Sequence, residues 1–492
     1  MYSIFRSLAV LDRRNRSYGL KKKIPRSRDN VCSLCGLSGS RKFIPARAPV
    51  PGSLFSPIGA ARAVMARRLE RFCSPGKGHG LRALAPLRPG ELLYTAEPFA
   101  CTVSTRGRGS TCESCFSRKE KLLRCSQCKI ARYCDASCQK AAWSEHKREC
   151  KCLRSFHPRI PTDSVRLAGR IVFKLLNYSS CPSEELFSLL EHESHIKEMS
   201  EEKKEGLGHL ATMLQLYLKE EVGDLSQLPP GLDIIHLFAI MTCNCFTISD
   251  GELQEIGVGL YPSMSLLNHD CDPNCVIVFQ GRRLFLRAIR EIRPAEELTV
   301  SYIDVLVPAQ ERRTQLQNQY CFVCECQQCD TRNKDEDMLA GNEKAWKSIK
   351  DATPGMEKLQ SQHQWEQVLS LCQTLVDNNQ GILPDTNIYL LKMLDYTMDA
   401  CINLRKWDKA LFFGTRTLQP YRMYYQGFHP ALGVQLMRLG KLQYYMERFC
   451  EALDTLKQAY EVMKVTHGVD HPLTTDLQQM LGECQAEMDR TT

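Results

Sequence analysis

The pattern of hydrophobic and polar positions divides the chain into a β-rich part and two helical parts. Alternating runs such as GLRALAPL and ELLYTAEPF begin near Phe72, and CVIVFQ, RLFLRAI and ELTVSYI follow between residues 243 and 303. Alternation of this kind predicts short strands. Residues 160–240, and the chain from about residue 337 onward, instead have apolar positions at helical spacing. The pattern predicts an α+β protein of several domains.

The last helical part contains an internal repeat of 42 residues. The segment Trp365–Leu369 matches Trp407–Leu411 and Phe449–Leu453, and His429-Pro430 and His471-Pro472 have the same spacing. A fixed period of this length predicts stacked helix pairs, in which each aromatic residue fills the same space between helices. Three unrelated amphipathic helices are the alternative. Stacked pairs usually form a concave surface, so we expect this part to bind or to gate another site.

Length and charge limit the classes of protein to consider. A chain of 492 residues exceeds what one hydrophobic core usually supports, so roughly two to four domains are expected. The formal net charge is +9, but residues 1–64 alone hold 13 Lys or Arg and 2 Asp or Glu. The rest of the chain is near neutral, so the charge gives little support to nucleic-acid binding by the folded part. No apolar run is long enough to span a bilayer.

Residues 1–64 have the composition of a disordered leader, because they are basic, poor in acidic residues and rich in Ser, Gly, Pro and Arg. Cys32 and Cys35 form a pair there, which we interpret as two free thiols because no second pair lies nearby. The composition suits a mitochondrial transit peptide, whereas the run Lys21–Lys23 suits a nuclear signal. Met65 could serve as an alternative start, so we expect the leader to be dispensable.

The cysteine pattern indicates metal binding. The chain has 25 cysteines and does not open on the apolar segment of a secretory signal peptide. Many of the cysteines cluster with histidine at metal-ligand spacings, which favours a reduced intracellular protein with zinc sites over a disulfide scaffold.

Residues 112–150 contain eight candidate zinc ligands in four pairs. A Cys-x-x-Cys pair places two thiolates on one tight turn, which suits a tetrahedral ion, and eight ligands are enough for two zinc ions. So short a segment cannot build a core of its own, so the metal must hold it together. Spacing alone does not determine which pairs share an ion. The ligands are Cys112, Cys115, Cys125, Cys128, Cys134, Cys138, His146 and Cys150.

A second cysteine cluster lacks one ligand. Cys324, Cys326 and Cys329 supply three thiols within six residues. Cys321, just upstream, and Cys271, far upstream, are the two candidates for the fourth position. If Cys271 is the fourth ligand, a zinc ion ties the turn around residue 271 to the later cluster.

That turn is unusual in its own right. Residues 266–275 read LLNHDCDPNC, in which two leucines lead into a run of turn-forming polar residues. Burying such a turn is unfavourable unless its polar groups meet specific partners. The stretch therefore indicates a functional site.

The same stretch carries a family resemblance. The pattern from Asn268 to Asn274 resembles the asparagine-histidine signature of SET-domain lysine methyltransferases, and Pro294–Tyr302 resembles the strand that ends in their catalytic tyrosine. Residues 112–150 resemble a MYND zinc finger. Together with the second cysteine cluster and the helical tail, these features resemble the SET-and-MYND family over about residues 72–492.

The resemblance implies a fold and a set of boundaries. It implies a β-rich SET fold split by the MYND finger, a cysteine-rich post-SET zinc site and a C-terminal α-helical domain of TPR-like repeats. The expected segments are the leader at 1–64, the first SET part at 72–111, the finger at 112–150, a helical insert at 151–242, the SET core at 243–303, the post-SET segment at 304–332 and the repeat domain at 337–492.

The resemblance also implies a cofactor, S-adenosylmethionine, and three structural zinc ions. Asn268 and His269 would hold the methionine part and the adenine, with Asn244 alongside. The glycine-rich turn at residues 76–80, which includes Lys77 and His79, would approach the carboxylate of the cofactor. The remaining cofactor residues would be Phe322 near the adenine, and Glu193 and His195 on the ribose side.

The lysine channel and the metal pairing follow from the same resemblance. Phe246, Tyr302 and Tyr320 would line the channel, with Tyr302 as the catalytic residue and also in contact with the cofactor. The third zinc site would use Cys271, Cys324, Cys326 and Cys329. The finger would be interleaved, with Cys112, Cys115, Cys134 and Cys138 on one ion and Cys125, Cys128, His146 and Cys150 on the other.

The chain departs from the family pattern at a few positions. Asp270 stands where the signature usually has Ser, and Ala295 stands where the strand usually has Gly. Lys77, His79 and His195 stand where relatives have other polar residues. None of these changes removes a group that the chemistry needs, but they bear on cofactor affinity.

The implied activity is transfer of a methyl group to lysines of histone and non-histone proteins. Such a displacement needs a neutral amine, which desolvation and a nearby positive charge favour. The alternative is a scaffold with little or no catalysis, whose finger binds proline-rich peptides and whose tail binds a chaperone. The complete set Asn244, Asn268, His269 and Tyr302 favours the enzyme. We expect a monomer without a membrane segment, located in the cytoplasm and the nucleus.

Overall fold

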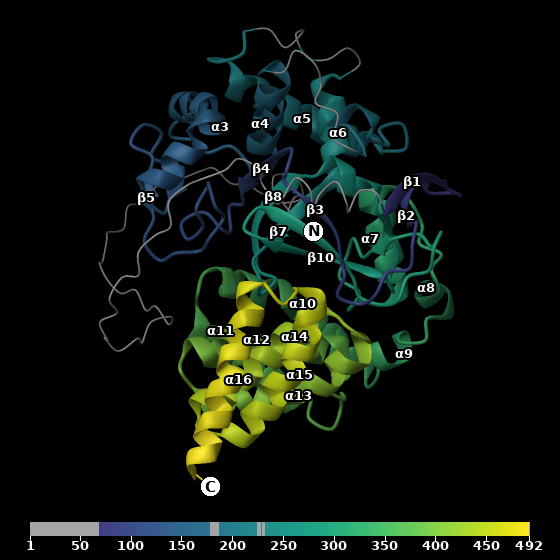
Figure 1. The fold of residues 1–492 in the computed structure, drawn as a ribbon, viewed down its shortest axis with the longest axis vertical. Coiled ribbons are helices and arrows are strands. Elements are labelled where there is room, and N and C mark those ends of the chain that lie inside the picture. The colour runs from purple at the N-terminus through teal and green to yellow at the C-terminus, as the bar shows by residue number, and fades with distance from the viewer. Residues whose placement is uncertain (1–67, 178–185, 224–227, 229–231, 492) are drawn as a thin grey trace.

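The computed structural model describes residues 68–177, 186–223, 228 and 232–491. The predicted leader at 1–64, with Cys32, Cys35 and the start at Met65, lies outside the described residues. Figure 1 shows strands in the middle of the molecule, helices α3–α6 on one side of them and the C-terminal helices on the other. In the part of the chain that the structure describes, no helix is long and apolar enough to cross a membrane.

The β-rich part consists of small sheets built from strands far apart in the sequence. Both predicted strand regions are confirmed, and each pairs with the other: β3 pairs with β11 and β4 with β8, across more than 150 residues. After β4 the chain therefore leaves the β-rich part, forms the finger and the insert, and then returns to pair with the earlier strands. The strands are β1 Leu69–Ser74, β2 Gly78–Ala83, β3 Leu92–Ala96, β4 Ala100–Val103, β7 Cys245–Ser249, β8 Glu255–Leu260, β9 Asn268–His269, β10 Cys275–Gln280, β11 Arg283–Ala288 and β12 Thr299–Val300.

The finger and the insert pack on one side of these sheets. A two-stranded hairpin, β5 Leu123–Arg124 and β6 Arg132–Tyr133, leads into α3 Ala136–Ser155. One apolar core joins the finger cysteines to the insert helices, so the finger is not a separate bead on the chain. The insert helices are α4 Asp163–Asn177, α5 Glu201–Leu218 and α6 Ile234–Asn244.

The C-terminal part is the predicted array of helix pairs. Trp365, Trp407 and Phe449 each begin a helix, and the 42-residue repeat is confirmed in space. After the SET core come α7 Ala309–Tyr320, α8 Gln327–Thr331 and α9 Asp335–Met338. The array consists of α10 Glu343–Ser361, α11 Trp365–Asn378, α12 Ile388–Asn403, α13 Trp407–Tyr424, α14 Pro430–Tyr445, α15 Phe449–Thr466 and α16 Pro472–Thr491.

The repeat also has a backbone signature. His363, Arg405 and Glu447, each two residues before a repeat aromatic, have φ values of 56°, 57° and 59°. These left-handed residues end one helix and turn the chain into the next at the same point of each repeat. The repeated His-Pro pairs have a related role, because the His429 and His471 imidazoles accept hydrogen bonds from the amides two residues later, at 3.2 Å each. They cap the helices that Pro430 and Pro472 begin.

The three repeat aromatics lie at equivalent positions. Trp365, Trp407 and Phe449 are each the first residue of a helix, and each is half-buried. The first residue of a helix lies at its end, where a large ring packs on the core with one face and meets solvent with the other.

The array is attached to the rest of the protein at both ends. Near its start, Lys350 on α10 and the Tyr389 hydroxyl on α12 contact the Glu311 carboxylate on α7, at 2.6 and 3.0 Å. Near its end, an imidazole nitrogen of His467 lies 3.0 Å from the Gly251 carbonyl oxygen, between β7 and β8. The array therefore contacts the rest of the protein near both of its ends.

Candidate functional site

The eight finger ligands form two separate groups of four. One group, the first zinc cluster, contains Cys112, Cys115, Cys134 and Cys138, and the other, the second zinc cluster, contains Cys125, Cys128, His146 and Cys150. Within each group all ligand atoms lie within 4.8 Å of one another. Zinc–sulfur bonds of about 2.3 Å in a tetrahedron put sulfur atoms about 3.8 Å apart. The Cys115–Cys134 and Cys125–Cys150 sulfur separations of 3.6 and 3.7 Å fit that geometry.

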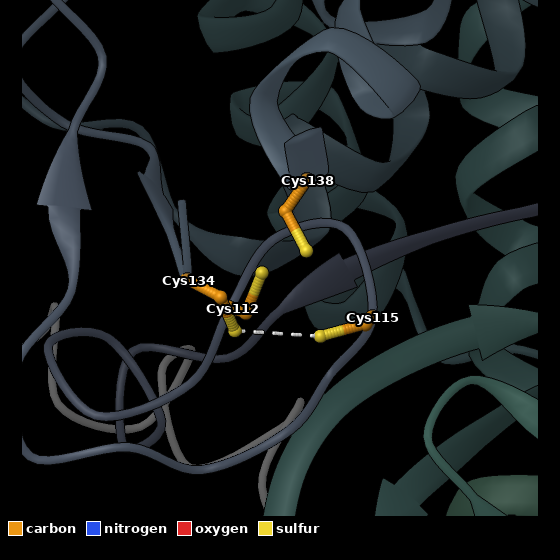
Figure 2. Close-up of side chains that lie close together, drawn as sticks. All are labelled: Cys112, Cys115, Cys134 and Cys138. Atoms are coloured by element: carbon orange, nitrogen blue, oxygen red, sulfur yellow. Dashed lines mark hydrogen bonds between the residues drawn. The ribbon is translucent and has the colours of Figure 1, made fainter. Parts of the chain in front are cut away.

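Helix α3 explains why the pairs interleave. Its first turn carries Cys138, whose amide donates to the N-cap carboxylate of Asp135 at 2.8 Å, and its later turns carry His146 and Cys150. The beginning of one helix therefore completes the first zinc cluster and the remainder completes the second. Figure 2 shows the sulfur atoms of the first zinc cluster converging, with a dashed line at the Cys115–Cys134 contact. The interleaved pairing that the resemblance implied is confirmed.

A third group of ligand atoms shows which residue joins Cys324, Cys326 and Cys329. Cys271 lies with Cys324, Cys326 and Cys329, with all four sulfur atoms within 4.8 Å of one another. Its sulfur is 4.0 Å from that of Cys324 and 3.6 Å from that of Cys329. Cys321 instead ends helix α7 in a left-handed conformation, with φ 62°, and does not belong to the group. The third zinc cluster thus joins the turn at 268–274 to the segment after α7.

That turn is held by β-pairing and by one buried amide. Strand β9 runs parallel to β12, with Asn268 opposite Thr299 and His269 opposite Val300. The Asn274 side chain, 2% exposed, accepts from the Thr299 amide at 2.9 Å and donates to the Glu297 carbonyl oxygen at 2.7 Å. Asn274 therefore replaces the water that a buried turn would otherwise need.

Two asparagines on this site present the same chemical group. The Asn268 side-chain nitrogen donates to the Glu297 carboxylate at 2.7 Å and to the His79 carbonyl oxygen at 3.2 Å. The Asn244 side-chain nitrogen donates to the carbonyl oxygens of Glu193 and Ile240, at 3.0 and 2.8 Å. Each NH2 group is fully used, so each amide offers its oxygen to a ligand. Two such oxygens suit a hydrogen-bond donor, such as an ammonium group.

An aromatic cluster lies beside Asn268. The His269 Nδ1 atom accepts from the Tyr302 amide at 3.0 Å, and the two rings are 5.3 Å apart. Burial lowers the pKa of His269 to about 4, so the imidazole is neutral and its Nε2 carries the proton toward Cys271. Tyr302 packs on Tyr320 with ring centroids 4.8 Å apart, and Phe322 lies 6.0 Å from the ring of His269.

Tyr302 keeps its proton in this setting. Desolvation raises the pKa of the Tyr302 hydroxyl above its usual value, and the Glu297 and Cys243 charges raise it further. The hydroxyl donates to the Leu267 carbonyl oxygen. Its proton is therefore occupied, and the lone pairs of the oxygen remain to accept a hydrogen bond from a substrate. Phe246, on β7, packs edge-on against Tyr261 at 5.6 Å within the same sheet core.

Four further residues that were predicted to bind the cofactor make contacts with other protein groups. The Lys77 ammonium is 3.8 Å from the Glu297 carboxylate, and the His79 ring packs near Phe187 at 6.4 Å. Glu193 reaches Asn244 through its main chain, while the His195 ring turns to the Glu198 carboxylate at 2.6 Å.

Two neighbours were missed from the sequence, and both stand beside predicted residues. Glu297 lies in the segment Pro294–Tyr302, where it looks like an ordinary acidic strand residue. Phe187 follows residues outside the described part of the chain and carries no motif. Only the contacts of Asn268 and His79 reveal them.

Comparison with known proteins shows the family to which the chain belongs. The SET domain family model matches residues 78–303. The chain is 52% identical to Histone-lysine N-methyltransferase SMYD3 of Homo sapiens over 421 residues, 86% of this chain and 98% of that protein. It is 35% identical to N-lysine methyltransferase SMYD2 of Homo sapiens over 425 residues, 84% of this chain and 97% of that protein. A solved structure of Rubisco LSMT bound to AdoMet matches with a TM-score of 0.30 and 12% identity, covering 88% of this chain and 92% of that chain. The chain belongs to the SMYD family of lysine methyltransferases, in which a SET domain is joined to a zinc finger of the MYND type.

Proposed function

We propose that the chain is a protein-lysine N-methyltransferase that takes its methyl group from S-adenosylmethionine. The single observation that carries the proposal is that the side-chain nitrogens of Asn268 and Asn244 are both taken up by protein acceptors, which leaves both amide oxygens for a ligand. An amino-acid ammonium group is a donor of the kind these oxygens accept. S-adenosylmethionine, when bound, supplies a methyl group activated by a positively charged sulfur.

The residues of the chain would prepare the substrate amine. A lysine side chain in water has a pKa of about 10.4, and its lone pair must be free before it can accept a methyl group. A channel lined by Phe246, Tyr302 and Tyr320 desolvates the amine, which favours its neutral form. The Tyr302 oxygen, whose own proton is held by Leu267, accepts a hydrogen bond from the amine and orients its lone pair. Alignment of two bound reactants would supply most of the acceleration.

The three zinc clusters would act on structure and not on the reacting bond. Each has four protein ligands, which is the closed coordination typical of structural zinc. The third zinc cluster would hold Cys271, and with it Asn268 and His269, at a fixed distance from the segment that carries Tyr320 and Phe322. The finger clusters would hold the finger against the insert.

The test is binding followed by transfer. Isothermal titration of S-adenosylmethionine into the zinc-loaded protein should show one site per chain. Label from the methyl group should then appear on a subset of lysines in a panel of protein and peptide substrates. Absence of binding would reject the proposal.

The choice of partner is a separate proposal. The substrates are lysine-containing proteins, with histone tails as the first to test because one relative is named a histone-lysine methyltransferase. A proline-rich peptide at the finger and a chaperone at the helical array rest on the family resemblance. So do a monomeric state and a location in the cytoplasm and the nucleus. Fractionation of cells and light scattering of the purified protein would test these last two directly.

A further inference from the structure

We propose that Glu297 is a positioning residue of the cofactor site, whose carboxylate orients the Asn268 amide so that its oxygen faces the cofactor. The inference rests on the proposed function and deepens it, because it assigns a role to a residue outside the asparagine-histidine signature. Glu297 does not contact the reacting atoms in this account. It acts through Asn268 and through Lys77.

The first support is the direct contact. The Glu297 Oε1 atom accepts from the Asn268 side-chain nitrogen at 2.7 Å, and the His79 carbonyl oxygen accepts the other hydrogen of the same nitrogen at 3.2 Å. Both neighbours are acceptors only. An amide turned by 180° would place its oxygen against a carboxylate and a carbonyl, which is unfavourable. The pair of acceptors therefore selects one orientation of Asn268.

The second support is the glycine at position 80. Its φ does not lie in the left-handed region, so no backbone strain requires a glycine there. A Cβ atom at Gly80 would lie 2.7 Å from the Glu297 Oε1 atom and 3.0 Å from the Asn268 side-chain nitrogen. Any larger residue would thus push apart the carboxylate–amide pair. Strand β2 leaves space at this one point for the pair to form.

The third support is the way in which the main chain of Glu297 is held. Arg82 on β2 forms an antiparallel β-bridge with Glu297 through the main chain, and the Leu298 amide donates to the Leu81 carbonyl oxygen at 2.8 Å. The Asn274 side chain holds the Glu297 carbonyl oxygen at 2.7 Å. The carboxylate is therefore fixed at its base, and its reach to Asn268 costs little further conformational entropy.

The Glu297 carboxylate also contacts a cation. The Lys77 ammonium lies 3.8 Å from its Oε2 atom, and the Lys77 side chain is 46% exposed. The carboxylate therefore attracts the partly exposed Lys77 ammonium, which belongs to the turn at residues 76–80. A glutamine at position 297 would lose this attraction, and its NH2 group could also donate to Asn268 and allow the amide to turn over.

The experiment compares two ligands that differ at the amino-acid end. S-adenosylhomocysteine has the ammonium and carboxylate groups, whereas 5′-methylthioadenosine lacks both. Titration into zinc-loaded full-length protein should show that Glu297→Ala raises the Kd of S-adenosylhomocysteine at least tenfold. The Kd of 5′-methylthioadenosine should stay within twofold of the wild-type value. Glu297→Gln should give an intermediate loss. The exposed Glu291→Gln is the matched control and should change neither ligand.

A double-mutant cycle separates positioning from general support of the fold. In an Asn268→Ala background, Glu297→Gln should weaken S-adenosylhomocysteine binding much less than it does beside Asn268, because only the contact with Lys77 is then lost. The inference would be overturned, with the proposed function intact, by any of three results: an equal loss of affinity for both ligands, fully additive changes in binding free energy in the cycle, or unchanged affinity in both Glu297 variants. If the wild type binds neither ligand, the proposed function fails as well. Zinc content and circular dichroism identify variants that do not fold, and Glu297→Gln then carries the test because it keeps the size of the side chain.

Discussion

The Glu149 carboxylate lies 3.2 Å from the Nδ1 atom of His146, whose Nε2 atom is 3.6 Å from the Cys128 sulfur. One carboxylate thereby sets which ring nitrogen faces the second zinc cluster, because its hydrogen bond takes up the other. Glu149 also binds Arg166 at 3.0 Å and Arg170 at 2.7 Å, both on helix α4. A zinc ligand of the finger is thus connected to the insert through a buried charge network.

Glu149→Gln should weaken both the zinc site and the fold. Glu149 and Arg166 are fully buried, and Glu113 contributes a second carboxylate that binds both arginines at 2.9 Å. Removing one charge from such a network typically costs about 3–5 kcal/mol. We expect faster zinc loss to a chelator and a lower melting temperature. Glu145→Gln, at an exposed position of the same helix, is the control and should change neither.

Cys271→Ala should remove one of three zinc ions and lower cofactor affinity together. Asn268 and His269 lie on the two-residue strand just before Cys271, and the His269 ring is 3.3 Å from the Cys271 sulfur. Loosening the cluster should therefore displace both cofactor groups. Elemental analysis and titration calorimetry measure the two effects. Loss of zinc with unchanged affinity would separate the cluster from the site.

Asp395→Asn should change how the stability of the helical array depends on pH. Burial, and then the nearby Asp399 charge, raise the pKa of Asp395 to about 7, although Arg438 and the Tyr421 hydroxyl oppose the rise. The folded protein binds this proton more tightly than the unfolded chain, whose aspartates have a pKa of about 3.9. The resulting stability is present below about pH 4 and is lost as pH rises through about 7.

The variant should therefore gain stability over wild type as the pH rises, by roughly 1–2 kcal/mol at pH 5 and by on the order of 3–4 kcal/mol at pH 8. Denaturant unfolding at both pH values measures this. Asp385→Asn, which removes a partly exposed partner of Arg416, is the control and should show no such gain at pH 8. Equal differences from wild type at the two pH values would contradict the assignment.

Trp407→Ala tests whether the array controls access to the site. Because Trp407 is half-buried, we expect a loss of about 1–3 kcal/mol, below the 3–5 kcal/mol typical of a fully buried aromatic residue. The array also meets the SET side near the site, where the Tyr425 hydroxyl donates to the Asp304 carboxylate at 3.1 Å, two residues after Tyr302.

If the array restricts large substrates, the KM for a folded protein should change more than the KM for a short peptide. Tyr445→Ala, at a ring that is 75% exposed, is the control. Equal changes for both substrates would mean that the array supports the fold and does not gate the site.

Features that rest on spacing could be predicted from the sequence. The zinc ligands and the 42-residue repeat are local patterns, and Cys-x-x-Cys pairs, whose thiols are three residues apart, are typical of metal binding. The strands were recognised by alternation, which reports local burial. Pairing between β3 and β11 joins Leu92–Ala96 to Arg283–Ala288, and no local pattern specifies a partner so distant.

The sequence predicted site residues only where a motif assigns a role to the residue. The motifs give roles to Asn268, His269 and Tyr302. Glu297 stands within the Pro294–Tyr302 motif, but only its contact with Asn268 indicates a role for it. The contact between the His195 ring and the Glu198 carboxylate, at 2.6 Å, was not predicted either. Contacts of this kind depend on side-chain conformation, which spacing does not encode.

The central claim is tested most directly by methyl transfer from labelled S-adenosylmethionine to lysine, comparing wild type with Tyr302→Phe. The change removes one hydroxyl and keeps the ring packing on Tyr320 and His269, so folding, zinc content and cofactor affinity should be unchanged. Loss of one positioned hydrogen-bonding group at a reaction centre typically lowers turnover by about 10²–10³-fold. We predict a wild-type protein that labels lysine and a variant whose kcat falls on this scale. A wild type that binds the cofactor but labels no lysine, or a variant with wild-type kcat, would contradict the account.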